Sequence, residues 1–242
     1  MKKLIAFFGL AIFAGGFTLF AQDLDEILES HFDVIGQKAL LTHKTFVMKG
    51  NVVQGGMEFP MVLYQKRPGM MRMEAEIQGT KLIQAFDGEI GWAVMPWTGS
   101  LEPQTMGEEE NKSLKQMADI DGDFYNWKEK GFDVALIGEE DMEGTPVYKI
   151  KLVKEDGDEF IYYLDAENYV ILRTDAKIEV NGTEVESQSY YGNYKQVGDI
   201  IMPHSIESRV NNQVTAQIVI DSYEMDVDLE DSLFSMPETV QE

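Results

Sequence analysis

The sequence predicts a mainly β fold with helices, of the α+β class, built on an antiparallel sheet or barrel. Three observations lead to this prediction. Apolar and polar residues alternate with a period of two through most of the chain, which is typical of strands that bury one face. Turn dipeptides such as Asp87-Gly88 and Asp156-Gly157 separate the alternating stretches. A helical period is confined to one region near the start and another near the middle.

Residues 1–21 have the pattern of a cleavable secretory signal peptide. Lys2 and Lys3 precede an apolar run over residues 4–20, and Ala21 precedes the expected cleavage point. Leu19 is larger than the residue usually found three positions before the cut. The alternative is an uncleaved membrane anchor, for which the run has only the minimum length of roughly 17 residues. We therefore expect a mature chain that begins at residue 22 and is soluble outside the cytoplasm.

Residues 23–41 are predicted to form one amphipathic helix. Acidic residues lie in its first turn, where they interact favourably with the helix dipole. The apolar positions have the i, i+3, i+4, i+7 spacing of a helix that covers a core, and they are Leu24, Ile27, Leu28, His31, Phe32, Ile35 and Ala39.

The period changes to two after Thr45, and the pattern predicts adjacent strands within residues 46–97. Residues 106–118 then predict a helix with Leu114 and Met117 as its apolar contacts, followed by a stretch rich in turns and aromatic residues up to residue 130. Strand signals resume at Val134 and continue to residue 227. No linker or change of composition divides this pattern, so we expect a single domain over residues 22–242.

The composition excludes several classes of partner. The chain has 43 acidic and 20 basic residues, a net charge of −23, and 44 % hydrophobic residues, which is enough for a packed core. Such a charge argues against nucleic acid, whose phosphates need a basic surface, and against unspecific adhesion to anionic membranes. The chain contains no cysteine, so it has neither a disulfide nor the residue that carries a lipid anchor.

The motifs of common enzymes are missing from the sequence. There is no cysteine nucleophile, no Gly-x-Ser-x-Gly elbow, and no phosphate-binding or dinucleotide-binding glycine motif. The stretch "DIDGDF" over residues 119–124 fails as a calcium loop because Gly122 is its fourth residue and not its sixth. His31 lies on the apolar stripe of the first helix, where we expect a core residue. We predict no catalytic activity, no cofactor and no metal, with a hydrolase as a remote alternative.

Methionine is the unusual feature of the composition, with 14 residues. Its flexible, polarizable side chain suits surfaces that accept varied apolar partners, although ordinary core packing is the alternative for any single methionine. Several methionines fall on one phase of neighbouring predicted strands together with aromatic residues. An acyl chain is a suitable ligand for such a face, and the candidate cavity residues are Phe46, Met48, Met57, Phe59, Met61, Leu63, Met71, Met73 and Trp92.

The stretch "YQKRPGMMRMEAEIQGTKLIQAFDGEIGWAVMP" over residues 64–96 resembles the central signature of the LolA-like outer-membrane lipoprotein-sorting proteins. A strand ends in Lys-Arg-Pro, and two strands, an Asp-Gly turn and a strand with an aromatic residue and a proline follow. The chain end "DVDLEDSLFSMPETV" also resembles the Phe-x-x-Pro close of that family. The chain is longer and more acidic than the short carriers, so we expect a divergent member.

This resemblance implies a half-open, strongly curved antiparallel sheet, an incomplete barrel, wrapped over helices that act as a lid. It implies a periplasmic carrier that binds acyl chains of lipoproteins or lipids and relays them from an inner-membrane donor complex to an outer-membrane acceptor. The arginine of Lys-Arg-Pro holds the lid closed in this family, and that role falls on Arg67. A surface ion pair is the alternative for Arg67. The resemblance also leads us to expect a monomer that is not an integral membrane protein.

A signalling or protein-interaction module on the same fold is the second hypothesis for the function. Such a module would bind a partner protein through the sheet edge or the lid, and its binding would persist after Met71 and Met73 are replaced.

Overall fold

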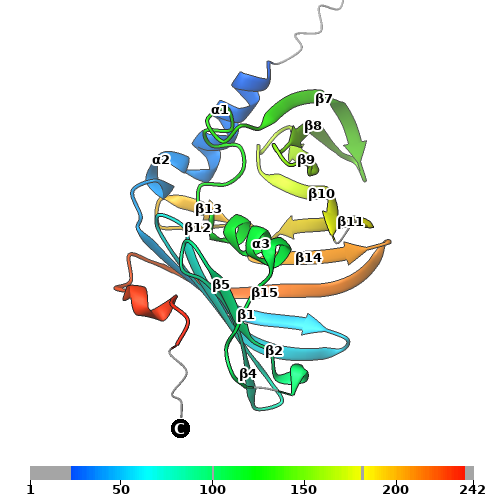
Figure 1. The fold of residues 1–242 in the computed structure, drawn as a ribbon. Helices are drawn as coiled ribbons and strands as arrows, with labels where there is room; N and C mark the ends of the chain where they lie inside the picture. The colour runs from blue at the N-terminus through cyan, green and yellow to red at the C-terminus, as the bar shows by residue number, and fades with distance from the viewer. Residues whose placement is uncertain (1–22, 100, 181–182, 238–242) are drawn as a thin grey trace, which may run out of the picture.

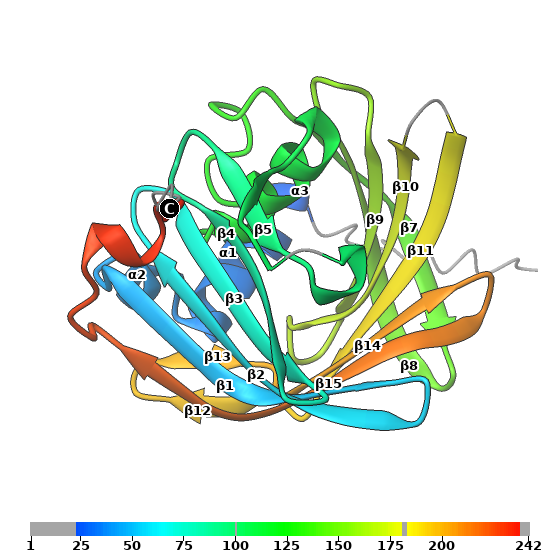
Figure 2. The same ribbon diagram turned by 60° about the horizontal axis from the view of Figure 1, so that its bottom comes forward.

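The computed structural model describes residues 23–99, 101–180 and 183–237, so the predicted signal peptide lies outside the described residues. The fold is mainly β, with one antiparallel 13-stranded sheet, one short hairpin and few helices. This confirms the predicted mainly β class and the antiparallel pairing. Figures 1 and 2 show the arrangement of the elements from two sides.

The strands follow each other in space nearly as they do in the sequence. The order in the sheet is β6-β5-β4-β3-β2-β1-β15-β14-β11-β10-β9-β8-β7, so β6 and β7 are its edges, and β12 pairs with β13 separately. The bounds are β1 (Thr45–Gln54), β2 (Met57–Lys66), β3 (Met70–Ile77), β4 (Thr80–Phe86), β5 (Gly91–Val94), β6 (Gln104–Thr105), β7 (Asp133–Met142), β8 (Thr145–Val153), β9 (Glu159–Asp165), β10 (Ile171–Val180), β11 (Thr183–Gly192), β12 (Lys195–Val197), β13 (Ile200–Met202), β14 (Ser205–Val210) and β15 (Gln213–Met225).

The prediction of one helix over residues 23–41 is wrong, because two helices meet there at Gly36. Helix α1 (Leu24–Ile35) ends where Gly36 adopts φ +75°, and α2 (Gln37–Leu40) follows in a new direction. A Cβ atom at Gly36 would lie 2.3 Å from the carbonyl oxygen of Asp199. Glycine is therefore required both by the left-handed backbone and by the close approach of the β12–β13 hairpin.

The second predicted helix is confirmed as α3 (Glu108–Ala118). Leu114 is buried as expected, but Met117 is largely exposed and Ala118 takes its place in the core. Two 3₁₀ turns, η1 (Pro96–Thr98) and η2 (Asp231–Leu233), complete the helices. Within the described part of the chain, no helix has the length and apolar character needed to span a membrane.

The two faces of the sheet are covered by different segments. On the inner face, Leu114 of α3 packs on Met71 and Phe86, while Ile27 of α1 packs in a second cluster that contains Ile150. On the outer face of β1–β5, the C-terminal segment (residues 226–237) packs on the strands, with Phe234 and Leu229 against Val47, Val62 and Tyr64. Figure 2 shows α1 and α3 on one side of β1–β3 and the C-terminal segment, in red, on the other.

Candidate functional site

Eight of the nine candidate cavity residues share the inner face of β1, β2 and β3. Ladder partners point to the same side of a sheet, and Leu63 pairs with both Met48 and Met73. The alternation along the strands adds the remaining members on this side, which are Phe46, Met57, Phe59, Met61 and Met71. Trp92 lies on the outer face, because it pairs with Ala85, which in turn pairs with Arg72.

The methionines on the inner face form a continuous apolar strip. Met48 and Met61 are buried in one cluster with Ala75 and Ile220. Met71 belongs to a second cluster under α3 and is 0 % exposed. Leu63 and Met73 pack against both clusters and join them.

The ends of this strip are less uniform. Phe46 packs with Leu40 of α2 and Ile200 of β13, outside the methionine clusters. Phe59 is buried, whereas Met57 at the start of β2 is 49 % exposed. The eight residues therefore share a face but differ in their surroundings, and those at the centre of the strip are buried by neighbouring side chains.

Helix α3 covers the strip with a small apolar contact and several specific polar ones. Leu114 and Ala118 are its buried residues. The Asn111 side chain accepts a hydrogen bond from the backbone N–H of Gly91 (2.6 Å) and donates to the Met106 carbonyl (3.2 Å). A Cβ atom on Gly91 would lie only 2.7 Å from Leu114 Cδ1, so glycine lets the helix sit this close to β5.

Arg67 joins three segments at the end of β2. Its Nε donates to the His43 carbonyl (2.8 Å), and its Nη2 donates to the Leu40 carbonyl (3.2 Å) at the end of α2. The same Nη2 lies 2.6 Å from Oδ1 of Asp121, as an ion pair without the alignment of a hydrogen bond. Gln37 Nε2 donates to the Asp121 carbonyl (3.1 Å), so α2 and the loop after α3 are tied to each other at this point.

The neighbouring cations bind the C-terminal segment on the outer face. Lys66 Nζ approaches the Leu229 carbonyl (2.5 Å) and Asp231 Oδ1 (2.6 Å). Arg72 donates to the Leu233 carbonyl (3.0 Å) and to Glu74 Oε1 (2.8 Å), and its guanidinium lies 5.4 Å from the centroid of the Trp92 ring. The Trp92 indole N–H donates to the carbonyl of Phe234 (2.7 Å), so Trp92 anchors this segment.

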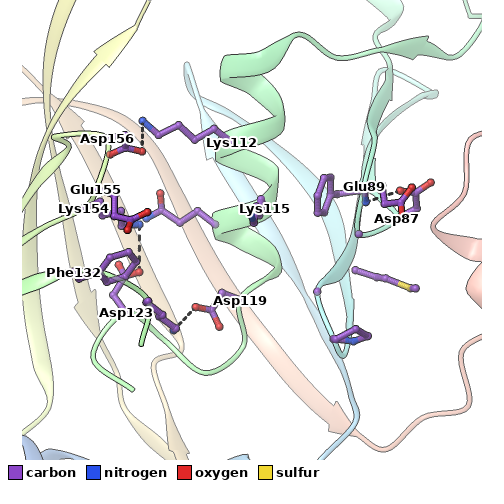
Figure 3. A pocket seen from close by; sticks show the side chains of 17 residues that line it. Asp87, Glu89, Lys112, Lys115, Asp119, Asp123, Phe132, Lys154, Glu155 and Asp156 are labelled. Atoms are coloured by element: carbon purple, nitrogen blue, oxygen red, sulfur yellow. Dashed lines mark hydrogen bonds and ion pairs between the residues drawn. The ribbon is translucent and has the colours of Figure 1, made fainter. Parts of the chain in front are cut away.

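A cavity of about 790 Å³ lies at the rim of the strip, beside α3. Its walls combine lysines and carboxylates with a few apolar residues such as Phe86 and Phe132. The methionine among them, Met70, does not belong to the strip, because it packs with Val47 and Phe234 on the outer face. Figure 3 shows that α3 stands between two groups of side chains, with Asp87 and Glu89 on one side and Asp123, Lys154 and Asp156 on the other.

One wall of this cavity is a buried polar network. Lys154 Nζ lies 3.3 Å from Asp123 Oδ1 and faces the rings of Phe132 and Phe160 at 5.4 and 4.7 Å. The Tyr162 hydroxyl donates to the other oxygen of Asp123. Burial, together with the nearby Asp123 charge, raises the pKa of Tyr162 well above its usual value, so the hydroxyl stays protonated and keeps donating.

The acidic residues of the stretch rejected as a calcium loop are paired with side chains of the protein. Asp119 binds Lys130 (2.6 Å), Asp121 pairs with Arg67, and Asp123 binds Tyr162 and Lys154. Across residues 23–99, 101–180 and 183–237, no group of three or more metal-ligating side chains is placed to hold an ion. His31 is a core residue, as predicted, and its Nδ1–H donates to the Tyr169 carbonyl (2.7 Å).

Neither a protein-family model nor a curated protein sequence matches the chain. Solved structures do match its fold over most of its length. A LolA superfamily protein from Nitrosomonas europaea aligns at 15 % identity and a TM-score of 0.58, covering 89 % of this chain and 98 % of that one. A domain from Vibrio parahaemolyticus described as an outer membrane lipoprotein-sorting protein aligns at 10 % identity and a TM-score of 0.58, covering 86 % and 97 %.

The chain has a divergent LolA-like fold. A DUF1329 family protein from Desulfovibrio piger shares it as well, at 14 % identity and a TM-score of 0.59, with 86 % of this chain and 97 % of that one covered. Both LolA-like structures are matched almost end to end, so the likeness extends over most of this chain and is not limited to a small part of it.

Some residues around α3 were not found by sequence reasoning. Lys112 of α3 binds Asp156 Oδ2 (2.9 Å) and Asp158 Oδ2 (2.6 Å) in the turn between β8 and β9. The partners are more than forty positions apart, and neither lies in a motif, so no local pattern marks them. The sequence signals available were only the turn residues Asp156-Gly157 and the amphipathic period of α3.

Proposed function

We propose that this LolA-like chain is a non-enzymatic periplasmic carrier that binds the acyl chains of lipoproteins or lipids on the inner-face strip. One observation carries the proposal: a continuous methionine-rich strip lies under a helix that buries only two of its own residues and is otherwise held by polar contacts. The name of the Vibrio parahaemolyticus structure, which refers to lipoprotein sorting, supports it.

In this proposal the structure is the closed state of a half-open, curved sheet, and cargo enters when α3 and the loop after it move away. Uncovering the Leu114, Met71 and Phe86 side chains would cost roughly 5–9 kcal/mol, at about 1.5–3 kcal/mol each. An acyl chain contributes about 0.8 kcal/mol for each buried CH₂, so burying roughly ten methylene groups offsets that cost. A chain of ordinary length is therefore sufficient to hold the cavity open, and no covalent chemistry is needed.

The cellular route belongs to the proposal as well. Residues 1–21 would direct export, and residues 22–242 would form one domain that works as a monomer without a cofactor or a metal. An inner-membrane complex would load the carrier, and an outer-membrane acceptor would unload it. The excess of acidic residues supports release from anionic membrane surfaces, because like charges repel.

The direct test is to purify the exported full-length chain from the envelope, extract it and identify bound lipid or lipoprotein by mass spectrometry. Displacement of a fluorescent fatty acid then gives an affinity. Met71→Ser should weaken that affinity about tenfold, because a buried apolar side chain contributes on the order of 1.5 kcal/mol. Met117→Ser is the matched control, since Met117 is exposed on α3 and lies outside the strip, and it should change affinity less than about twofold.

An empty protein that also takes up no fatty acid would exclude the carrier role. A co-purified membrane protein that remains bound to the Met71→Ser/Met73→Ser double variant would instead favour the interaction module.

A further inference from the structure

Lys112 connects two regions of the molecule that are far apart in the sheet. Helix α3 packs on β3, β4 and β5, whereas Asp156 and Asp158 belong to the turn between β8 and β9. In the sheet order, β2, β1, β15, β14, β11 and β10 lie between β3 and β9. The two ion pairs of Lys112 therefore cross the opening between the β3–β5 half and the β8–β9 half of the inner face, which we call its mouth. Figure 3 shows Lys112 reaching from α3 to Asp156.

The acceptor side of this bridge is held in position without Lys112. The backbone N–H of Asp158 donates to Asp156 Oδ1 (3.1 Å), which orients that carboxylate. The backbone N–H of Lys154 donates to the Asp158 carbonyl (2.9 Å) and closes the turn. The Asp156 carboxylate and the backbone at Asp158 are thus fixed by local bonds of the turn, so α3 meets a preformed turn when it closes.

The three side chains of the bridge differ in burial, and this difference allows the bridge to break and re-form. The Asp158 side chain is only 7 % exposed, so its charge needs a partner whenever α3 is closed. Lys112 is 36 % exposed and Asp156 more so, which lets water replace the contact when α3 moves away. By contrast, the apolar contacts of α3 are made with β3, β4 and β5, in the other half of the sheet.

We propose that Lys112, Asp156 and Asp158 form a clasp that holds α3 across the mouth of the inner face, and that this clasp must open before an acyl chain enters. The inference rests on the proposed carrier function and adds a second closing contact, remote from Arg67. Arg67 fastens α2 and the loop after α3 at the end of β2, whereas Lys112 fastens the middle of α3 to the opposite half of the sheet.

The absence of cysteine allows two spin labels to be placed without background. Ser113→Cys puts one label on the exposed side of α3, and Ala135→Cys puts the other on an exposed position of β7, which pairs with β8. Pulsed dipolar spectroscopy on the full chain then measures the distance distribution between them. Lys112→Met should add a longer-distance population, raising the ratio of open to closed molecules roughly three- to tenfold, as expected for a partly exposed ion pair.

Lys115→Met is the matched control, because Lys115 lies one turn along the same cavity wall and has no ion pair among those observed in the described residues. It should give the distribution of the parent protein. Asp156→Asn provides a second variant that removes one negative charge of the clasp at an exposed position and should also lengthen the distance. Raising NaCl from about 0.1 M to about 1 M shortens the Debye length from about 10 Å to about 3 Å and should open the parent but not Lys112→Met.

The outcomes separate the clasp from the carrier function. If neither Lys112→Met nor Asp156→Asn changes the distances, with near-UV circular dichroism showing native packing, the clasp is overturned. If the distances lengthen and fatty acid enters faster in Lys112→Met, both proposals are supported. If the distances lengthen but no variant takes up fatty acid, the clasp stands as a structural contact and its role in cargo entry is overturned.

Discussion

Replacing Arg67 by leucine should open the lid at its α2 end while the sheet stays folded. The substitution removes two charge-assisted hydrogen bonds, to the carbonyls of Leu40 and His43, and the ion pair with Asp121. A hydrogen bond that involves a charged group contributes about 1.5–3 kcal/mol, but water rehydrates the carbonyls when the lid opens. We therefore expect a net loss of about 2–3 kcal/mol for the closed state, which favours opening by roughly 30- to 150-fold.

Hydrogen exchange measures this opening at named amides. The N–H groups of Leu40 and Leu41 donate to the carbonyls of Gly36 and Gln37 within α2, so their exchange reports the α2 end of the lid. Their rates should rise by that factor in Arg67→Leu, whereas amides of β8 and β9 should keep their protection. Release of a bound fluorescent fatty acid should accelerate in parallel.

Arg72→Leu is the matched control for this experiment. It makes the same change in the strand that follows, but Arg72 bonds to the Leu233 carbonyl on the outer face. It should speed exchange in the C-terminal segment and leave α2 unchanged. Unchanged α2 exchange in Arg67→Leu, together with release at the parent rate, would refute the assignment of Arg67 as a lid contact and leave the surface ion pair as its role.

Three further predictions concern the core. Phe234→Ala should lower the free energy of unfolding in urea by about 3–4 kcal/mol and expose the indole N–H of Trp92 to exchange in NMR spectra, because Phe234 is fully buried; an unchanged indole would contradict the anchoring. Asp123→Ala should lower the free energy of unfolding by about 2–4 kcal/mol, more than Lys154→Met does, because it leaves both Tyr162 and Lys154 without their partner; a larger loss in Lys154→Met would contradict this. Burial lowers the pKa of His31 below its ordinary 6.5, despite the Tyr169 carbonyl, so stability should fall as pH drops through about 6.5 towards 5, and His31→Asn should flatten that slope.

Strand positions and faces were predictable because alternation is a local property. The structure places β8 and β9 at Thr145–Val153 and Glu159–Asp165, on the stretches that alternate in the sequence. The same holds for Met48, Met61, Met71 and Met73, which share one face of β1, β2 and β3. Side-chain direction within a strand needs no knowledge of distant residues.

Features that depend on distant contacts were not predictable. Trp92 falls on the outer face because the four-residue connection between Phe86 and Gly91 sets the phase of β5 against β4, and periodicity within β5 alone cannot give that phase. The break at Gly36 exists because Asp199 approaches from the β12–β13 hairpin. Met117 faces solvent because α3 meets the sheet along a narrow stripe that Leu114 and Ala118 already fill.

The basic turn after β2 has a physical explanation that its acidic surroundings alone do not provide. In a chain with 43 acidic residues, a cation finds a carboxylate at almost any position, so ion pairing does not require three cations in one turn. Lys66, Arg67 and Arg72 each have a carboxylate partner, but all three also reach backbone carbonyls. These carbonyls belong to Leu229, to Leu40 and His43, and to Leu233.

Carbonyls at the ends of short helices and in irregular segments lack partners of their own, and cationic donors satisfy them. Arg67 acts in this way on the inner side, at the end of α2, and Lys66 and Arg72 act on the outer side, along the C-terminal segment. The connected ends of β2 and β3 thereby hold α2 on the inner face and the C-terminal segment on the outer face. Because Arg67 and Arg72 serve opposite faces, a substitution at one of them can loosen one cover and leave the other in place.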